Sequence, residues 1–168
     1  MTVEIRALTA HDWEVFRATR LRALAEAPDA FRSTYDAESG QSDDHWRDMV
    51  SRTAAHPDGE IFLGSIDGRP GAIAFVRVEQ DSATARIGAM WVDPAFRGRG
   101  VGSKVLAAAL DFGRAAGAEW AELAVRDDNG PAQRLYAAAG FEPMSRTEPL
   151  RDDSALTVRW MRRALGTS

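Results

Sequence analysis

The chain has 168 residues, of which 45% are hydrophobic and 8% aromatic, and this composition suits one domain with a sizeable core. Its formal net charge of −4 argues against a nucleic-acid binder held by phosphate contacts, and no apolar run approaches the ~20 residues of a membrane span. The absence of cysteine removes disulfides, thiolate metal sites and a cysteine nucleophile. Since the first six residues carry no signal-peptide pattern, we expect a cytoplasmic protein with a single domain over 1–168.

The N-terminal third of the sequence predicts a strand followed by two helices. Residues 3–8 alternate in polarity enough to indicate a half-buried strand. Residues 9–12 are suited to begin a helix, with Asp12 in its first turn, and Pro28 ends that helix. A short second helix is predicted over 42–51.

The rest of the sequence alternates between strands and helices. Residues 67–71, Asp-Gly-Arg-Pro-Gly, form a turn signal between two apolar segments, 61–66 and 72–78, so we expect a β-hairpin. The elements after it are expected in this order: a strand over 85–92, a helix over 101–116, a strand over 120–125, a helix over 131–139 and a final strand over 155–161. Together these elements predict a mixed α/β sheet in one domain.

Residues 97–102 read Arg-Gly-Arg-Gly-Val-Gly and lie between a predicted strand and a predicted helix. Glycines let the backbone approach a ligand closely, and the free N–H groups of a first helical turn point along the positive end of the helix dipole. Arg97 and Arg99 add forked donors that suit phosphate oxygens. This segment, called the glycine loop below, therefore predicts a site for a phosphorylated ligand.

Two well-known glycine-rich motifs fit the glycine loop less well. A Walker A loop requires Gly-Lys-Ser/Thr, whereas the order here is Gly102-Ser103-Lys104, which misplaces the lysine. A dinucleotide fingerprint requires Gly-x-Gly-x-x-Gly in an opening βαβ unit, but this chain has Gly-x-Gly-x-Gly in its middle. A tight turn with solvated arginines is the plainest alternative, and the helix that follows in register favours the phosphate site instead.

The pattern Arg-x-x-Gly-x-Gly after a strand resembles the acetyl-CoA signature of the GNAT N-acetyltransferase superfamily. A second block, residues 125–136 followed by Gly140-Phe141, is similar to the family's later segment, where a strand ends near an asparagine and a helix carries a tyrosine. The resemblance covers residues 85–142 well and the N-terminal third more loosely. It implies a single-domain α/β, GNAT-like fold with a mixed, mostly antiparallel central sheet flanked by helices, and an enzyme that uses acetyl-CoA.

The resemblance also implies how the cofactor is held. It places the pantetheine arm antiparallel to the strand that ends at Val92, where a backbone N–H also polarises the acetyl carbonyl; an ordinary buried strand is the alternative. Asn129 is similar to the asparagine that contacts the cofactor arm, although it can also serve an Asp-Asn-Gly turn. The cofactor-binding residues implied in this way are Met90, Val92, Arg97, Gly98, Arg99, Gly100, Val101, Gly102, Ser103, Asn129 and Tyr136.

Tyr136 matches the family's tyrosine that serves the departing sulfur. A phenol has a reference pKa of ~10 and a thiol ~8.5, so we expect Tyr136 to donate a hydrogen bond as charge develops and not to transfer its proton fully. The alternative is a helix tyrosine that only packs beside Phe141. The position of Tyr136 between Asn129 and Gly140 favours the catalytic role.

The base that accepts the amine's proton is not fixed by the sequence. An amine with a lysine-like pKa of ~10.4 is mostly protonated at neutral pH, and without cysteine its direct attack on the thioester is the simpler route. Some family members carry a glutamate on the strand before the loop, but residues 86–92 offer no carboxylate. Glu38 is the first candidate, Glu122 is the second, and a water chain to solvent stays open.

The acceptor pocket is predicted to contain Tyr35, Glu38 and Trp46, and the acidic stretch around them suits a cationic amine. No metal site is expected, because His45 lacks a second histidine or cysteine nearby. The favoured function is acetylation of a primary amine on a small molecule. The alternatives are a protein N-terminal or lysine acetyltransferase and a non-catalytic acyl-CoA-binding sensor. Acetyl-CoA and an amine are the expected partners, without nucleic acid or membrane, and a homodimer stays open.

Overall fold

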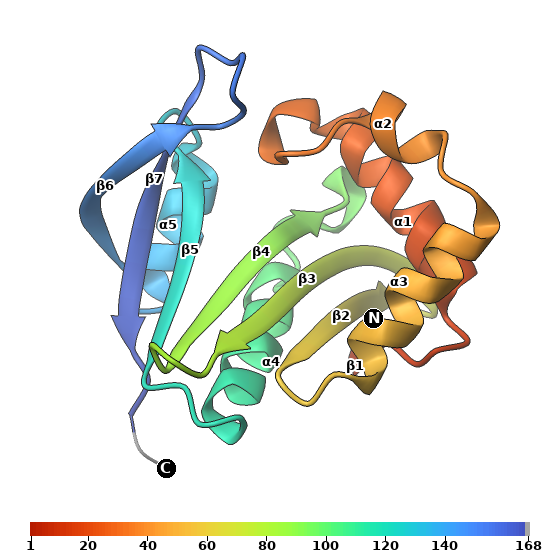
Figure 1. The fold of residues 1–168 in the computed structure, drawn as a ribbon, viewed down its shortest axis with the longest axis horizontal. Coiled ribbons are helices and arrows are strands. Elements are labelled where there is room, and N and C mark those ends of the chain that lie inside the picture. The colour runs from red at the N-terminus through yellow and green to blue at the C-terminus, as the bar shows by residue number, and fades with distance from the viewer. Residues whose placement is uncertain (167–168) are drawn as a thin grey trace.

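The structure, a computed structural model, describes residues 1–166 and contains a seven-stranded sheet with helices on both faces (Figure 1). The strands are β1 (Val3–Ala7), β2 (Gly59–Ile66), β3 (Arg69–Glu79), β4 (Thr84–Val92), β5 (Trp120–Arg126), β6 (Glu142–Pro149) and β7 (Thr157–Ala164). The helices are α1 (Trp13–Glu26), α2 (Tyr35–Ser39), α3 (Asp43–Ala55), α4 (Val101–Ala115) and α5 (Gly130–Ala138), with short 3-10 turns η1 (Pro28–Ala30) and η2 (Pro94–Phe96).

The strand order is β1-β2-β3-β4-β5-β7-β6, and neighbours run antiparallel except for β4 and β5. A parallel pair needs a crossover, which α4 supplies between β4 and β5. The predicted fold class, a mixed and mostly antiparallel sheet flanked by helices, is therefore confirmed.

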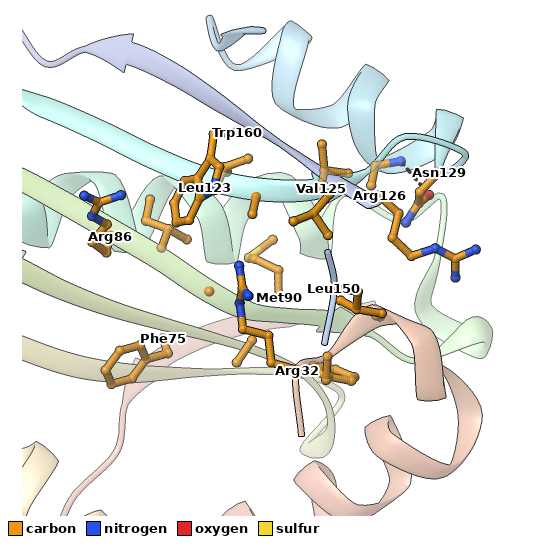
Figure 2. A pocket seen from close by; sticks show the side chains of 18 of the residues that line it. Arg32, Phe75, Arg86, Met90, Leu123, Val125, Arg126, Asn129, Leu150 and Trp160 are labelled. Atoms are coloured by element: carbon orange, nitrogen blue, oxygen red, sulfur yellow. Dashed lines mark hydrogen bonds between the residues drawn. The ribbon is translucent and has the colours of Figure 1, made fainter. Parts of the chain in front are cut away.

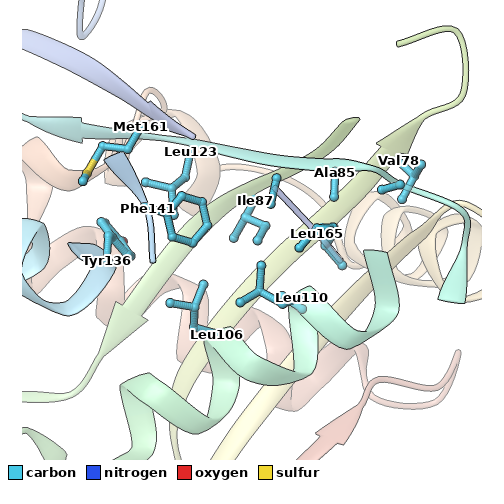
Figure 3. Packing of buried hydrophobic residues seen from close by; sticks show 14 of the residues in the cluster. Val78, Ala85, Ile87, Leu106, Leu110, Leu123, Tyr136, Phe141, Met161 and Leu165 are labelled. Carbon is cyan, nitrogen blue, oxygen red and sulfur yellow. The ribbon is translucent and has the colours of Figure 1, made fainter. Parts of the chain in front are cut away.

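Two large hydrophobic clusters lie between the sheet and its helices, one on each face. On one face, Leu106 of α4 and Tyr136 of α5 share a buried cluster with Leu123 of β5 (Figure 3). On the other face, Leu24 of α1 and Trp46 of α3 belong to a second cluster. Because helices cover both faces, the central strands bury side chains on both sides.

The opening lies between β4 and β5. These strands pair at three positions, from Thr84 opposite Trp120 to Arg86 opposite Glu122, and then diverge (Figure 1). A register irregularity between β3 and β4 surrounds Ala89, whose φ of 53° lies in the left-handed region. The edge of β4 beyond Arg86 therefore faces β5 without a strand partner in the described chain.

Several predicted elements differ from the structure at their ends. The hairpin is confirmed, but β3 already begins at Arg69 because Asp67 and Gly68, with φ of 49° and 76°, complete a two-residue turn. Asp12 precedes α1 instead of lying in its first turn. Its carboxylate accepts hydrogen bonds from Arg6 and from the backbone N–H of Thr9, so it does not cap the helix.

Two elements escape the sequence prediction. β6 is an edge strand whose side chains are mostly exposed and which carries Pro143 and Pro149, so it lacks apolar alternation. The five-residue α2 buries no side chain and starts at the cap Thr34. The second predicted helix, expected over 42–51, continues to Ala55 as α3.

Candidate active site

The divergence of β4 and β5 opens a cleft made of two adjoining cavities. The loop pocket, about 720 Å³, lies between the glycine loop, the end of β4 and the start of α5. The central pocket, about 460 Å³, lies between β4 and β5 next to the α1–α2 connection (Figure 2). Met90, Asn129 and Tyr136 line both cavities, so the two form one continuous cleft.

The glycine loop forms one end of this cleft. Gly98 and Gly100 have φ of 75° and 81°, which only glycine adopts at little cost, and Gly100 precedes the first residue of α4. The first-turn N–H groups of α4 have no intrahelical partner and carry the positive end of its dipole. Arg97 is held in place, because its Nε donates to the Val92 carbonyl at 3.0 Å and its Nη2 pairs with Glu26 at 2.9 Å.

Nine of the eleven predicted cofactor-binding residues line the loop pocket: Met90, Val92, Arg97, Gly98, Gly100, Gly102, Ser103, Asn129 and Tyr136. Arg99 is exposed and lies outside the residues that line it. Val101 is fully buried in a third apolar cluster with Phe96, so its side chain packs beneath the loop. For these two residues a role in cofactor binding stays a prediction.

α5 brings Asn129 and Tyr136 to the wall opposite β4. The Asn129 Oδ1 accepts the backbone N–H of Ala132 at 3.2 Å and so caps α5, which leaves its amide N–H groups for other partners. Tyr136 is 7% exposed, and its ring meets Phe141 edge to face at 6.2 Å between centroids. Burial raises the pKa of Tyr136 to about 12. The phenol is therefore protonated at neutral pH and acts as a donor.

Both candidate bases are engaged in ion pairs. Arg20 donates to Glu38 through Nε at 2.9 Å and through Nη2 at 2.7 Å. Burial acts to raise the pKa of Glu38, but the hydrogen bonds and charge of Arg20 outweigh burial and hold that pKa below its ordinary value. Glu122 is 6% exposed and contacts Arg86 Nη1 at 2.7 Å and Arg162 Nε at 3.3 Å. Neither carboxylate belongs to the residues that line the central pocket.

A third cavity, the apolar pocket of about 560 Å³, lies between α1, α3 and the sheet and shares Arg20, Phe75 and Ala89 with the central pocket. Glu38 and Trp46, two of the three residues predicted for the acceptor pocket, line it, and their role in acceptor binding stays a prediction. The Trp46 indole N–H is buried without a hydrogen-bond partner in the described chain. Tyr35 is 44% exposed and lines none of these three cavities, so the structure does not bring it together with Glu38 and Trp46 there.

The central pocket also contains residues that the sequence interpretation missed. Its charged lining residues are all arginines: Arg20, Arg32, Arg86 and Arg126. They come from α1, the α1–α2 connection, β4 and the end of β5, so no local motif marks them. Only a correct sheet topology brings these four segments together.

The described chain lacks two features that would point to a different kind of site. None of the helices within residues 1–166 combines the length and apolar character that a bilayer crossing requires. The same residues contain no group of three or more His, Cys, Asp or Glu side chains arranged to hold a metal ion.

Comparisons with known proteins agree with this geometry. A family model described as the acetyltransferase (GNAT) family matches residues 20–141. The chain is 33% identical over 135 residues to a mycothiol acetyltransferase of Beutenbergia cavernae, covering 80% of this chain and 42% of that protein. It is 31% identical over 160 residues to a mycothiol acetyltransferase of Clavibacter sepedonicus, covering 95% of this chain and 46% of that protein. The chain thus spans less than half the length of these relatives.

Solved structures share the fold at low sequence identity. An acetyltransferase of the GNAT family from Streptococcus pneumoniae superimposes with a TM-score of 0.81 at 16% identity, over 98% of this chain and 100% of that one. The protein yncA from Salmonella typhimurium, solved with its cofactor acetyl-CoA, gives a TM-score of 0.79 at 16% identity, over 100% of this chain and 96% of that one. At 16% identity, these similarities establish a shared fold alone.

Proposed function

We propose that this chain, which belongs to the GNAT acetyltransferase family, is an N-acetyltransferase that moves the acetyl group of acetyl-CoA directly to the primary amine of a small molecule. The observation that carries this proposal is the continuous cleft between β4 and β5, which has the glycine loop at one end and Tyr136 in its wall. The names of the curated relatives support a small-molecule acceptor.

The loop pocket fits the anionic end of acetyl-CoA. A Cβ atom built on Gly98 or Gly100 meets no protein atom within 4 Å, so the space beside these backbone atoms is open to a ligand. The first-turn N–H groups of α4 and the guanidinium of Arg97 offer donors and positive charge to the pyrophosphate. The unpaired edge of β4 beyond Arg86 offers backbone groups to an extended amide chain such as pantetheine.

When bound, acetyl-CoA supplies the acetyl group as a thioester. The acceptor nitrogen forms a bond to the carbonyl carbon, the carbon–sulfur bond breaks with its electron pair on sulfur, and one amine proton leaves. A backbone N–H around Met90 to Val92 polarises the carbonyl oxygen in this proposal. Tyr136 donates its hydroxyl hydrogen bond to the sulfur. Full proton transfer from a phenol of pKa about 12 to a thiolate of ~8.5 is uphill by about 5 kcal/mol, so solvent completes the protonation.

The proton that the amine loses passes to water in this proposal. Glu38 and Glu122 are each held by arginine, and the described residues that line the central pocket include no carboxylate. An acceptor amine that enters the cleft in its neutral form needs no protein base.

The test is thiol release from acetyl-CoA across a panel of small primary amines, a tripeptide with a free N-terminus and a lysine-containing peptide. Acetyl-CoA binding is measured in parallel by calorimetry. We expect binding together with thiol release from small amines. Release from the peptides alone would favour a protein acetyltransferase, and binding without release from any amine would favour the sensor.

A further inference from the structure

The charge of the central pocket differs from what a cationic acceptor requires. Arg20, Arg32, Arg86 and Arg126 line it, and no acidic residue belongs to its described lining. The carboxylates that pair with these arginines lie outside it, as Glu148 does for Arg32. In Figure 2, Arg86 and Arg126 mark opposite ends of the pocket, and Arg32 extends between them. The wall therefore presents guanidinium groups to whatever enters, and each of them is paired with a carboxylate outside the lining.

The guanidinium groups also keep hydrogen-bond donors for a ligand. Arg20 uses Nε and Nη2 on Glu38, and Arg126 uses Nε and Nη2 on Asp128, so Nη1 of each has no protein acceptor in the described chain. Arg32 bonds Glu148 through Nη2 alone, and its side chain is 55% exposed. An arginine fork with spare N–H groups matches the two oxygens of a carboxylate.

The ring systems next to these arginines hold them in place. The Arg20 guanidinium lies 4.6 Å from the centroid of Phe31, and that of Arg86 lies 4.9 Å from the centroid of Trp160. Stacking and ion pairing restrict the arginines before a ligand arrives, so less side-chain freedom is lost on binding. The apolar pocket opens beside them across Phe75. Its mostly apolar wall, which includes Trp46 and Ile73 besides the charged Glu38 and Arg77, has room for an uncharged side chain.

We propose that the acceptor carries a carboxylate beside its primary amine, so that it is an amino acid with an apolar side chain, and that Arg32 is the main residue that selects the carboxylate. This inference rests on the proposed function and narrows its substrate class. The acetyl transfer is the same as above, with the new bond formed at the α-nitrogen. A polyamine has no group that accepts hydrogen bonds from a guanidinium, and a protein N-terminus has an amide where an amino acid has its carboxylate.

The experiment compares acceptors that differ in the carboxylate alone. L-phenylalanine is paired with L-phenylalaninamide and 2-phenylethylamine, and L-methionine with 3-(methylthio)propylamine, each assayed for thiol release from acetyl-CoA. We expect kcat/KM for the amino acid to exceed that of its neutral partner by about 10- to 100-fold, the size of one or two charge-assisted hydrogen bonds. The amide is the closer control, because it keeps the shape of the acceptor and removes the carboxylate charge.

Arg32→Gln tests the assigned residue. It is expected to lower kcat/KM for L-phenylalanine about 10- to 100-fold more than kcat/KM for 2-phenylethylamine, so the preference for the acid disappears. Arg52→Gln is the matched control, because Arg52 also pairs with a carboxylate, Asp48, but lies exposed on α3 outside the three cavities. Arg52→Gln should leave kcat/KM unchanged for both L-phenylalanine and 2-phenylethylamine.

The outcomes separate this inference from the function on which it rests. Equal or faster acetylation of the neutral partners, or an unchanged preference in Arg32→Gln, overturns the carboxylate site and leaves the acetyltransferase intact. If no amine releases thiol, the proposed function fails. The carboxylate site is then tested by a binding measurement that needs no turnover. N-acetyl-L-phenylalanine should bind the CoA-loaded protein more tightly than its amide in calorimetry, and equal binding overturns the carboxylate site.

Discussion

The two ends of the cleft offer hydrogen-bond donors of different kinds. At the loop end, the donors are backbone N–H groups of consecutive residues, shaped by Gly98 and Gly100 and oriented by α4. In the central pocket, the donors are side chains from four separate segments, among them Arg20 on α1 and Arg126 at the end of β5. A backbone site suits one constant ligand, whereas a site built from dispersed side chains can change its specificity without changing the fold.

This difference predicts separate consequences of substitution. Changes at the loop end should act on acetyl-CoA whatever the acceptor. Changes at Arg20, Arg32 or Arg86, which line the central pocket and not the loop pocket, should act on the acceptor alone. Tyr136 lines both cavities and should act on the chemical step. A substitution at one end that changes the affinity for the ligand of the other end would mean that the two ends are coupled.

The largest effect is expected for Tyr136→Phe. Removing a donor to developing charge should lower kcat by about 10²- to 10⁴-fold, since the hydroxyl matters most when sulfur becomes negative. The acetyl-CoA Kd and the melting temperature should hardly change, because the ring and its edge-to-face contact with Phe141 stay. The measurements are steady-state kcat, calorimetric Kd and thermal unfolding.

An unchanged kcat for Tyr136→Phe, with chemistry shown to limit the rate by single-turnover kinetics, would make Tyr136 a packing residue. A large drop in melting temperature would also contradict the proposed role. In either case another group would have to donate a hydrogen bond to the sulfur, and Tyr136 would no longer be a functional residue common to both ends of the cleft.

Gly100→Ala is expected to weaken acetyl-CoA binding by about 10- to 100-fold, because its Cβ occupies the open space beside the first-turn N–H groups. Gly68→Ala is the matched control. Gly68 has φ of 76° against 81° for Gly100, and both lack protein atoms within 4 Å of a built Cβ. Both variants should therefore lose about 1 kcal/mol of unfolding free energy, and only Gly100→Ala should lose affinity. Equal acetyl-CoA Kd values for Gly100→Ala and Gly68→Ala would contradict a role of the glycine loop in cofactor binding.

The loop end of the site was predictable from the sequence because its geometry is local. A glycine at a left-handed position followed by a helix needs no distant residue, and the loop and α4 occur where the sequence predicts them. The Asp67-Gly68 turn is readable for the same reason. In each case a short stretch of chain fixes its own dihedral angles.

The central pocket was not predictable, because its composition depends on which strands are neighbours. The acidic residues near Glu38 suggested a cationic acceptor, but Arg20 neutralises Glu38 and faces the cavity itself. Arg32 and Arg126 are 94 positions apart in sequence and line the same wall only through the β4–β5 divergence. β6 escaped prediction for a related reason, since its pairing with β7 and not an apolar pattern defines it.

Glu122→Gln should affect stability more than catalysis. Glu122 joins Arg86 of β4 to Arg162 of β7 where the two halves of the sheet still pair. Because both arginines are partly exposed, losing this charge should cost about 1–2 kcal/mol of unfolding free energy. Glu119→Gln, at an exposed position nearby, should stay within about 0.5 kcal/mol of the parent. A fall in kcat of about 100-fold in folded Glu122→Gln would instead identify Glu122 as the base.

The smallest effect concerns alkaline pH, where we expect no loss of activity from Tyr136. A phenol donates its hydrogen bond only while protonated, so a pKa raised to about 12 moves the loss of that donor far above neutrality. Measured between about pH 6 and pH 10, kcat/KM should rise as the acceptor amine loses its proton and then stay level. A decline below pH 10 that disappears in Tyr136→Phe would mean that the phenol ionises in the working enzyme. Tyr136, which lines both ends of the cleft, would then contact more water than its exposed fraction of 7% implies.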